Sequence, residues 1–390
     1  MRKKTVLIIL AMAFVAVMAT LAWAEPSWAG KLQDAIAKTP AGPGPGQIHP
    51  DAPKGFLGIP GAPRPFWLWG ILWAIWVGWI FSTVGAFGGI MAGVGHITMF
   101  GLGDYGKAFK KTSPMMNKLI TDSIRVSNQW LVGLSALISS TNYYRMGRIV
   151  LPLGLFLAGG SVLGAFLIPV LTAGKIKLSA YIGYFGLCVF LIAFVLYYDT
   201  TEKGQAKKKE AKAAAKAFEE SVKAKKTGGA AAQAEELTGT RITHFSLTRI
   251  RFTFYGVEFS FNPIWPVVGG FFIAALAAFL GIGGGFLYVP FLTSIAGLPM
   301  YIVAGTSAVA VLIGMIISIF SYMVIKGVPV DFVLVGFELI GIATGSFIGP
   351  YTSKYIPEIW LKRLFVVLAI YVGIRYTTKG FLGYSVVPPF

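Results

Sequence analysis

An arginine inside an apolar stretch is the residue of this sequence with the clearest chemical potential. Arg125 lies in NKLITDSIRVSNQWLVGL, one helical turn after Asp122. An ionisable residue inside a membrane segment is a functional hypothesis by default, because burying its charge is costly. Arg125 could neutralise an anion, with Asp122 pairing with it when no anion is bound. The alternative is a structural Asp122–Arg125 pair near the membrane surface.

Two other ionisable side chains stand alone in apolar surroundings. Glu338 lies in VLVGFELIGIATG, and His96 lies in FGGIMAGVGH. A carboxyl group or an imidazole in such a place could carry a proton, so both are candidates for proton coupling. A hydrogen-bonded structural role is the alternative for each. The sequence has no clear set of metal ligands and no Walker A motif, so we expect no metal, no cofactor and no use of ATP.

Glycines gather in two long apolar blocks. One group lies in FLGIGGGFLYVP, residues 279–290. A dinucleotide-binding turn would need a strand before the glycines and an acidic residue about 20 positions later. Here a membrane helix precedes them, and the next acidic residue is Asp331. They therefore indicate a helix break whose N–H groups could bind an anion, with close helix packing as the alternative. The candidates are Gly88, Gly89, Gly283, Gly284 and Gly285.

A third candidate group combines a glycine with two hydroxyl side chains. Gly305, Thr306 and Ser307 precede a long apolar run. We expect a helix to begin after Gly305, so that hydroxyls and free backbone N–H groups there could hold an oxyanion. Ser127 and Asn128 occupy the corresponding place in the first half of the chain. Packing of small residues between helices is the alternative.

The composition predicts a membrane protein. Hydrophobic residues make up 55% of the chain and charged residues only 13%, whereas a soluble domain has about 25% charged residues. Several windows of roughly 20 apolar residues follow one another, which is the length that crosses a bilayer. A membrane-embedded enzyme would need clustered His and acidic residues, and the chain has 3 His. We therefore expect a polytopic protein that is not an enzyme.

The net charge of +18 does not indicate nucleic-acid binding, because nine lysines lie in one linker between residues 203 and 226. Such a cluster is typical of a cytoplasmic segment facing anionic lipid. Within this linker, KKKEAKAAAKAFEESVKAKK favours a solvated helix. Alternation of apolar and polar residues around Tyr255 and Gly256 predicts a small β-hairpin in residues 243–261.

Five regions follow from these patterns. The first is a signal peptide or an uncleaved anchor, and the second is rich in Pro and Gly, which favours a flexible or extended extracytoplasmic segment. The regions are residues 1–24, the Pro/Gly-rich residues 25–65, a first transmembrane repeat 66–199, the basic linker with its β-hairpin 200–263, and a second transmembrane repeat 264–383.

Each half contains one long apolar block and three ordinary spans. Gly160 and Gly164 in the first half recur as Gly341 and Gly345 in the second. If each block is a hairpin that turns at its glycines, the basic linker stays inside and the two halves are inverted. We therefore expect an all-α membrane fold with two inverted repeats, each a broken, re-entrant-like hairpin followed by three transmembrane helices. This organisation is typical of secondary transporters, whose substrate site lies at the breaks.

The second half resembles a known family. GIGGGFLYVPFLTSIAGLPMYIVAGTSAVAVLIGMIISIFSYMVIKGVPVD, GIATGSFIGPYTSKYIP and LKRLFVVLAIYVGIR are similar to the second repeat of the TauE/SafE family of sulfite and organosulfonate exporters. The first repeat resembles the family loosely, with RVSNQ where AGTSA would stand. The segment before residue 66 and the linker with its hairpin are additions to the usual core.

The resemblance implies a multi-pass transporter in the bacterial inner membrane. It would export a small sulfur-containing oxyanion, sulfite first, with proton coupling as a hypothesis. Lipids and the anion are the expected partners, a homodimer stays open, and nucleic acid is excluded. The alternative is a non-transporting membrane protein that docks partners through its linker and its segment before residue 66.

Overall fold

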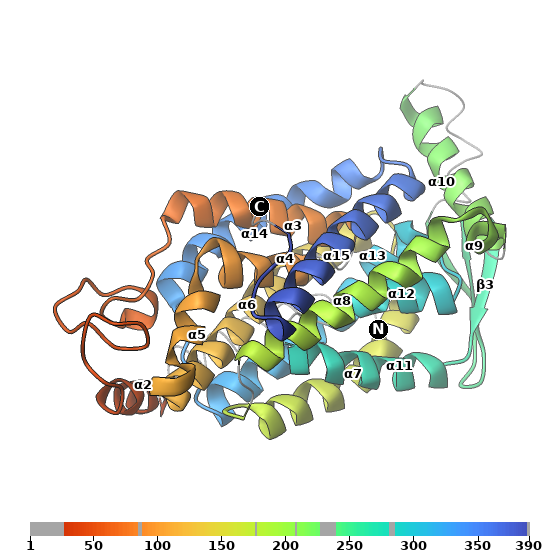
Figure 1. The fold of residues 1–390 in the computed structure, drawn as a ribbon. Coiled ribbons are helices and arrows are strands. Elements are labelled where there is room, and N and C mark those ends of the chain that lie inside the picture. Colours follow the sequence, from red (N-terminus) through yellow and green to blue (C-terminus); the bar gives the residue numbers. More distant parts are fainter. Residues whose placement is uncertain are drawn as a thin grey trace.

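The computed structural model describes residues 27–84, 88–175, 178–206, 209–226, 239–280 and 285–387. Long helices form a bundle, with α10 and a three-stranded sheet at one end and α2 at the opposite end (Figure 1). The predicted region 1–24 lies outside the described residues.

The elements before the sheet are α2 (Ser27–Ala37), η1 (Phe56–Gly58), α3 (Trp67–Val84), α4 (Gly88–Val94), η2 (Gly95–Met99), α5 (Leu102–Thr112), α6 (Pro114–Arg145), α7 (Leu151–Thr172), α8 (Leu178–Thr200), α9 (Glu202–Ala206) and α10 (Lys209–Lys226). The remaining elements are β1 (Thr240–Phe245), β2 (Ile250–Phe254), β3 (Val257–Phe261), α11 (Ile264–Leu280), α12 (Gly285–Pro290), η3 (Phe291–Ile295), α13 (Met300–Phe320), η4 (Ser321–Ile325), α14 (Phe332–Ser353) and α15 (Glu358–Phe381).

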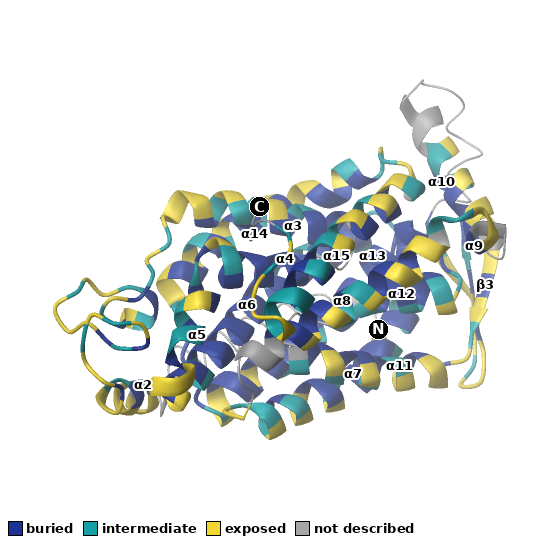
Figure 2. Cartoon of the chain, in the orientation of Figure 1, coloured by how far each residue is buried: buried dark blue, intermediate teal, exposed yellow. Residues whose placement is uncertain are grey.

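The outer faces of the helices are apolar. Trp69 on α3, Phe194 on α8 and Val367 on α15 are each more than half exposed, and exposed positions line the outside of the bundle (Figure 2). Within the described residues, α7, α13 with η4, and α14 are long and apolar enough to cross a membrane. Apolar surface of this extent is typical of helices that face lipid.

The main helix contacts link elements of the two halves in a reciprocal way. Helix α3 packs on α14 and α11 packs on α7, while α6 contacts α13 and α8 contacts α15. Glycines permit the close approaches, because a Cβ added at Gly341 would lie 2.3 Å from the carbonyl oxygen of Ile71. A Cβ at Gly160 would lie 1.8 Å from that of Val267. The glycines that correspond in sequence therefore make corresponding contacts.

Each long apolar block folds back on itself. In the first block, the indole Nε1 of Trp73 donates to the carbonyl oxygen of Met91 at 3.1 Å, and a Cβ at Gly88 would lie 2.3 Å from the Cβ of Phe81. In the second block, a Cβ at Gly269 would lie 2.5 Å from the ring of Phe291. A short helix and a π-helical turn thus follow α3 and α11 in the same order.

The linker contains the predicted hairpin and one strand more. β2 and β3 pair antiparallel around Tyr255 and Gly256, and β1 extends the sheet on the other edge of β2. The predicted helix is present as α10, but it is not fully solvated, because Phe218 is buried. Its ring lies 4.3 Å from that of Tyr301 and 5.3 Å from that of Tyr255, centroid to centroid.

The Pro/Gly-rich segment is folded, so the prediction of a flexible or extended chain is wrong for its described part. It contains α2, and Phe56 and Ile59 are fully buried. The backbone N–H of Leu57 donates to the Asp331 carboxylate at 2.7 Å. The segment has no core of its own and folds by packing on the helical bundle.

Candidate functional site

Among the described elements, helix α6 carries more buried polar side chains than any other. It begins at Pro114, directly after Ser113, whose hydroxyl caps the N–H of Met116 at 3.4 Å; Ser before Pro is a common helix start. Every residue from Thr121 to Gln129 is at most 3% exposed. This stretch is therefore buried on all sides although seven of its nine residues are polar or charged.

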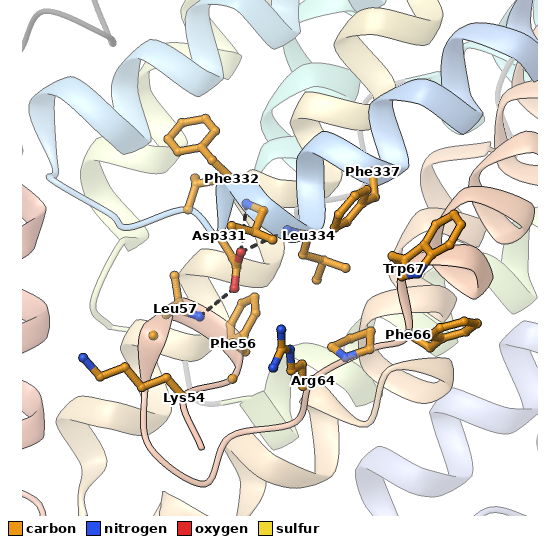
Figure 3. Close-up of a pocket in the computed structure, with 15 residues that line it drawn as sticks. Lys54, Phe56, Leu57, Arg64, Phe66, Trp67, Asp331, Phe332, Leu334 and Phe337 are labelled. Carbon is orange, nitrogen blue, oxygen red and sulfur yellow. Dashed lines mark hydrogen bonds between the residues drawn. The ribbon is translucent and has the colours of Figure 1, made fainter. Parts of the chain in front are cut away.

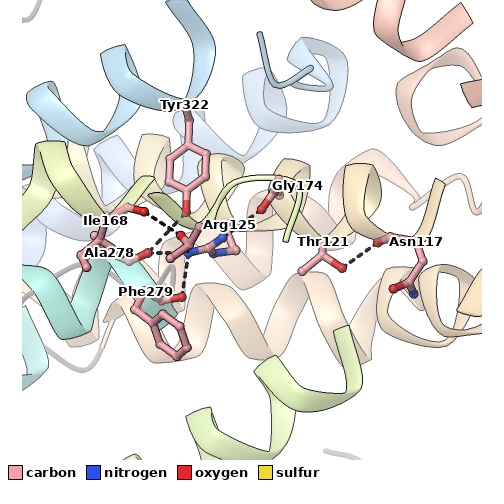
Figure 4. A network of polar contacts seen from close by, with 10 residues as sticks. Asn117, Thr121, Arg125, Ile168, Gly174, Ala278, Phe279 and Tyr322 are labelled. Atoms are coloured by element: carbon pink, nitrogen blue, oxygen red, sulfur yellow. Dashed lines mark hydrogen bonds and ion pairs between the residues drawn. The ribbon is translucent and has the colours of Figure 1, made fainter. Parts of the chain in front are cut away.

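Arg125 binds the end of the helix that precedes the second glycine cluster (Figure 4). Its Nη2 donates to the carbonyl oxygens of Ala278 and Phe279 at 2.8 and 2.7 Å. The last carbonyls of a helix have no partner within it, and a cation is favourable there. The guanidinium also lies 5.0 Å from the ring centroid of Tyr322. Arg125 thus holds α11 at the position where that helix ends.

The carboxylate of Asp122 is held by two donors. Its Oδ1 lies 2.9 Å from Nη1 of Arg125, and its Oδ2 accepts the backbone N–H of Gly174 at 2.6 Å. A guanidinium and an amide N–H are also the groups that proteins use to bind oxyanions. The predicted pair therefore exists, and it is buried beside the helix end rather than exposed.

A second buried cluster joins three residues that were singled out separately. Nδ1 of His96 lies 2.5 Å from Oδ1 of Asn128, and Nε2 lies 3.0 Å from Oε2 of Glu338. All three side chains are fully buried, and they come from η2, α6 and α14. The contact between Nε2 and Oε2 needs one shared proton, which either group can carry. Oε1 of Glu338 has no hydrogen-bond partner among the described residues.

The predicted helix start at Gly305 is wrong. Helix α13 begins at Met300, so the N–H groups of Thr306 and Ser307 lie beyond its free first turn. The Thr306 hydroxyl accepts the backbone N–H of Val150 at 3.0 Å and fixes the start of α7. A Cβ at Gly305 would lie 2.6 Å from the carbonyl oxygen of Arg148. These contacts match the packing alternative.

The glycine candidates are only partly described. Gly88 and Gly89 are buried at the start of α4, and the contact of Gly88 with α3 shows close packing. Gly285 is the first residue of α12. Gly283 and Gly284 lie outside the described residues.

Several buried polar side chains contain atoms that have no hydrogen-bond partner among the described residues. Buried polar atoms are nearly always paired in proteins, yet both amide atoms of Gln129 have no partner in the described part of the chain. The sequence prediction did not include Gln129, although its place beside Asn128 was a usable signal. The serine hydroxyls in the same condition are those of Ser123, Ser127, Ser139 and Ser318.

A cavity of about 820 Å³ lies apart from both clusters, between residues 54–67 and the start of α14. The carboxylate of Asp331 accepts the N–H groups of Val333 and Leu334 and that of Leu57 (Figure 3). Asp331 therefore caps α14 and anchors the preceding segment at once. No residue of either buried cluster lines this cavity.

A helical membrane protein with ionisable groups buried against interrupted helices belongs to the class of membrane transporters. The family model described as sulfite exporter TauE/SafE matches residues 71–376, and the chain belongs to the TauE/SafE family. A probable membrane transporter protein of Methanocaldococcus jannaschii is 34% identical over 121 residues, which are 29% of this chain. The match spans 45% of that relative's length. No solved structure matches the chain.

Proposed function

We propose that the protein is a secondary transporter that exports a small sulfur-containing oxyanion, sulfite or an organosulfonate, across the bacterial inner membrane. The observation that carries the proposal is Arg125, fully buried, with its guanidinium on the last carbonyls of α11. Buried cations are rare in membrane proteins and usually mark substrate or ion pathways. Membership of the TauE/SafE family supports an anion as the substrate.

The transport mechanism follows from two inverted repeats. The reciprocal packing of α3 on α14 and of α11 on α7 supports a repeat relationship between the halves. The basic linker would then face the cytoplasm, and the loop before α6 would face the exterior. Rocking of one repeat against the other would open the polar core around α6 to each side in turn.

Arg125 would neutralise the anion, and Ser127, Asn128 and Gln129 would supply hydrogen bonds to it. Coupling to protons would use the contact between His96 and Glu338. Its shared proton could leave when the core opens to one side, since neither residue has another ionic partner among the described residues.

Proteoliposomes loaded with sulfite test this function directly. Protein-dependent appearance of sulfite outside, with and without an imposed pH gradient, would support it; sulfate, taurine and sulfoacetate run in parallel would define the substrate. Arg363→Gln is a matched control for Arg125 variants, because Arg363 is exposed. Absence of flux for all four anions, from protein shown to be folded, would overturn the proposal.

A further inference from the structure

Three lysines from distant segments surround one small cavity. The cavity has a volume of about 350 Å³ and is lined by Lys31 of α2, Lys118 of α6 and Lys326, which follows η4. In the described part of the chain, no ion pair joins any of these lysines to a carboxylate. Like charges placed together repel one another, and a site with this arrangement attracts anions.

Asp122, which is 3% exposed, and Gly174 also line the same cavity. There the Asp122 carboxylate lies between Nη1 of Arg125 and the N–H of Gly174, at 2.9 and 2.6 Å. Arg125 and the N–H of Gly174 thus already bind one carboxylate beside this cavity, and that carboxylate is the protein's own Asp122. The lining of the cavity thus contains three lysines and a single carboxylate.

Lys31 connects this cavity to the additional N-terminal segment. Its Nζ donates to the carbonyl oxygen of Lys326 at 2.5 Å, so α2 is fastened over the loop after η4. A segment outside the matched family region therefore supplies one of the three lysines.

We propose that this cavity is an anion vestibule for a small oxyanion, and that Asp122 is its gate. An anion in the vestibule competes with the Asp122 carboxylate for Arg125 and the N–H of Gly174, and takes its place there. The direction of transport rests on the proposed function, in which this face of the protein is exterior and the anion leaves through the vestibule. Binding of an anion in the vestibule does not depend on that direction.

The first experiment replaces Asp122, the proposed gate. Purified full-length protein is heated with increasing sulfate or sulfite, with gluconate added to keep ionic strength constant, and the midpoint of unfolding is measured. We expect Asp122→Ala to unfold at a lower temperature than the wild type, because Arg125 loses its buried partner. Sulfate should restore its midpoint and should half-saturate at a concentration several-fold below that for the wild type. Asp104→Ala is the control, because Asp104 is exposed and pairs with Lys379 elsewhere.

Equal shifts by sulfate in Asp122→Ala, Asp104→Ala and the wild type would overturn the gate. If Asp122→Ala does not fold, the vestibule is tested by equilibrium binding of radiolabelled sulfite to the Lys118→Gln/Lys326→Gln variant. We expect affinity about tenfold weaker than for the wild type, with Lys107→Gln/Lys110→Gln unchanged. Equal affinity in all three proteins would overturn the vestibule. Binding without flux would instead overturn the transport function and leave the vestibule standing.

Discussion

The two buried clusters on α6 lie within two helical turns of each other but are built differently. Around Arg125, opposite charges are paired and every oxygen of Asp122 has a donor. Around His96, one proton is shared and Oε1 of Glu338 has no partner among the described residues. We propose that the first cluster responds to another anion that competes for the guanidinium, and that the second responds to the gain or loss of a proton.

This difference gives the two clusters separate parts in the proposed transport. Arg125 contacts the end of α11 in the second long block, whereas His96 belongs to the first block. Helix α6 contacts both, through Arg125 and through Asn128. If one long block moves relative to α6, this helix would transmit the movement to the cluster that contacts the other block.

Removing the charge of Arg125 should have the largest effect. We expect Arg125→Gln to lower sulfite flux at least about 100-fold, and to destabilise the fold by about 3–5 kcal/mol because Asp122 stays buried without its partner. Arg125→Lys should recover only part of the flux, since an ammonium cannot span the carboxylate and two carbonyls. Proteoliposome flux and thermal unfolding measure both effects. Normal flux in Arg125→Gln would reduce this cluster to a structural pair.

Replacing the carboxyl of the second cluster should separate coupling from anion transport. Glu338→Gln keeps a hydrogen-bonding group beside His96 but cannot bind or release a proton. We expect sulfite flux without a pH gradient to remain within about fivefold of the wild type, and the stimulation by a gradient to disappear. An unchanged dependence on the gradient would remove Glu338 from the coupling mechanism.

The sequence identified the members of these clusters better than it identified their partners. Glu338 and His96 stood out because each was ionisable in apolar surroundings, but their contact joins residues 242 positions apart. Only the packing of α3 and its hairpin on α14 brings them together. Gly341 and Gly345 lie in that contact between α14 and α3, although in the sequence they indicated only a repeat.

Two predictions failed, for different physical reasons. The residues Gly305, Thr306 and Ser307 resembled a helix start, whereas Pro299 precedes the true start at Met300. The Pro/Gly-rich segment lacked a core by composition, and its order comes from docking on Asp331 and the bundle. The helix start is therefore set locally, at Pro299, whereas the order of the Pro/Gly-rich segment depends on Asp331, far away in sequence.

A substitution at Thr306 should affect stability and not transport. Thr306→Val keeps the shape but leaves the N–H of Val150 without its acceptor, which should cost about 1–3 kcal/mol. Thr344→Val is the control, because the Thr344 hydroxyl is exposed and bonds only within its own helix. A lower unfolding midpoint with unchanged sulfite affinity is expected. Weaker sulfite binding at unchanged stability would return Thr306 to the list of substrate contacts.

The smallest effect on flux is expected beside another buried cation, Arg148. A substitution there tests whether transport needs more than the two clusters on α6. Arg148 lies over the rings of Tyr143, Tyr301 and Phe218 of α10 at 4.6, 5.4 and 5.1 Å. Phe218→Ala should loosen α10 and speed proteolysis at its lysines, while sulfite flux stays within about twofold of the wild type. Lys216→Ala, on the exposed face of α10, should change neither. Flux that falls together with the docking of α10 would instead make the linker part of the transport mechanism, because Phe218 and Glu219 of α10 both contact Tyr301 of α13.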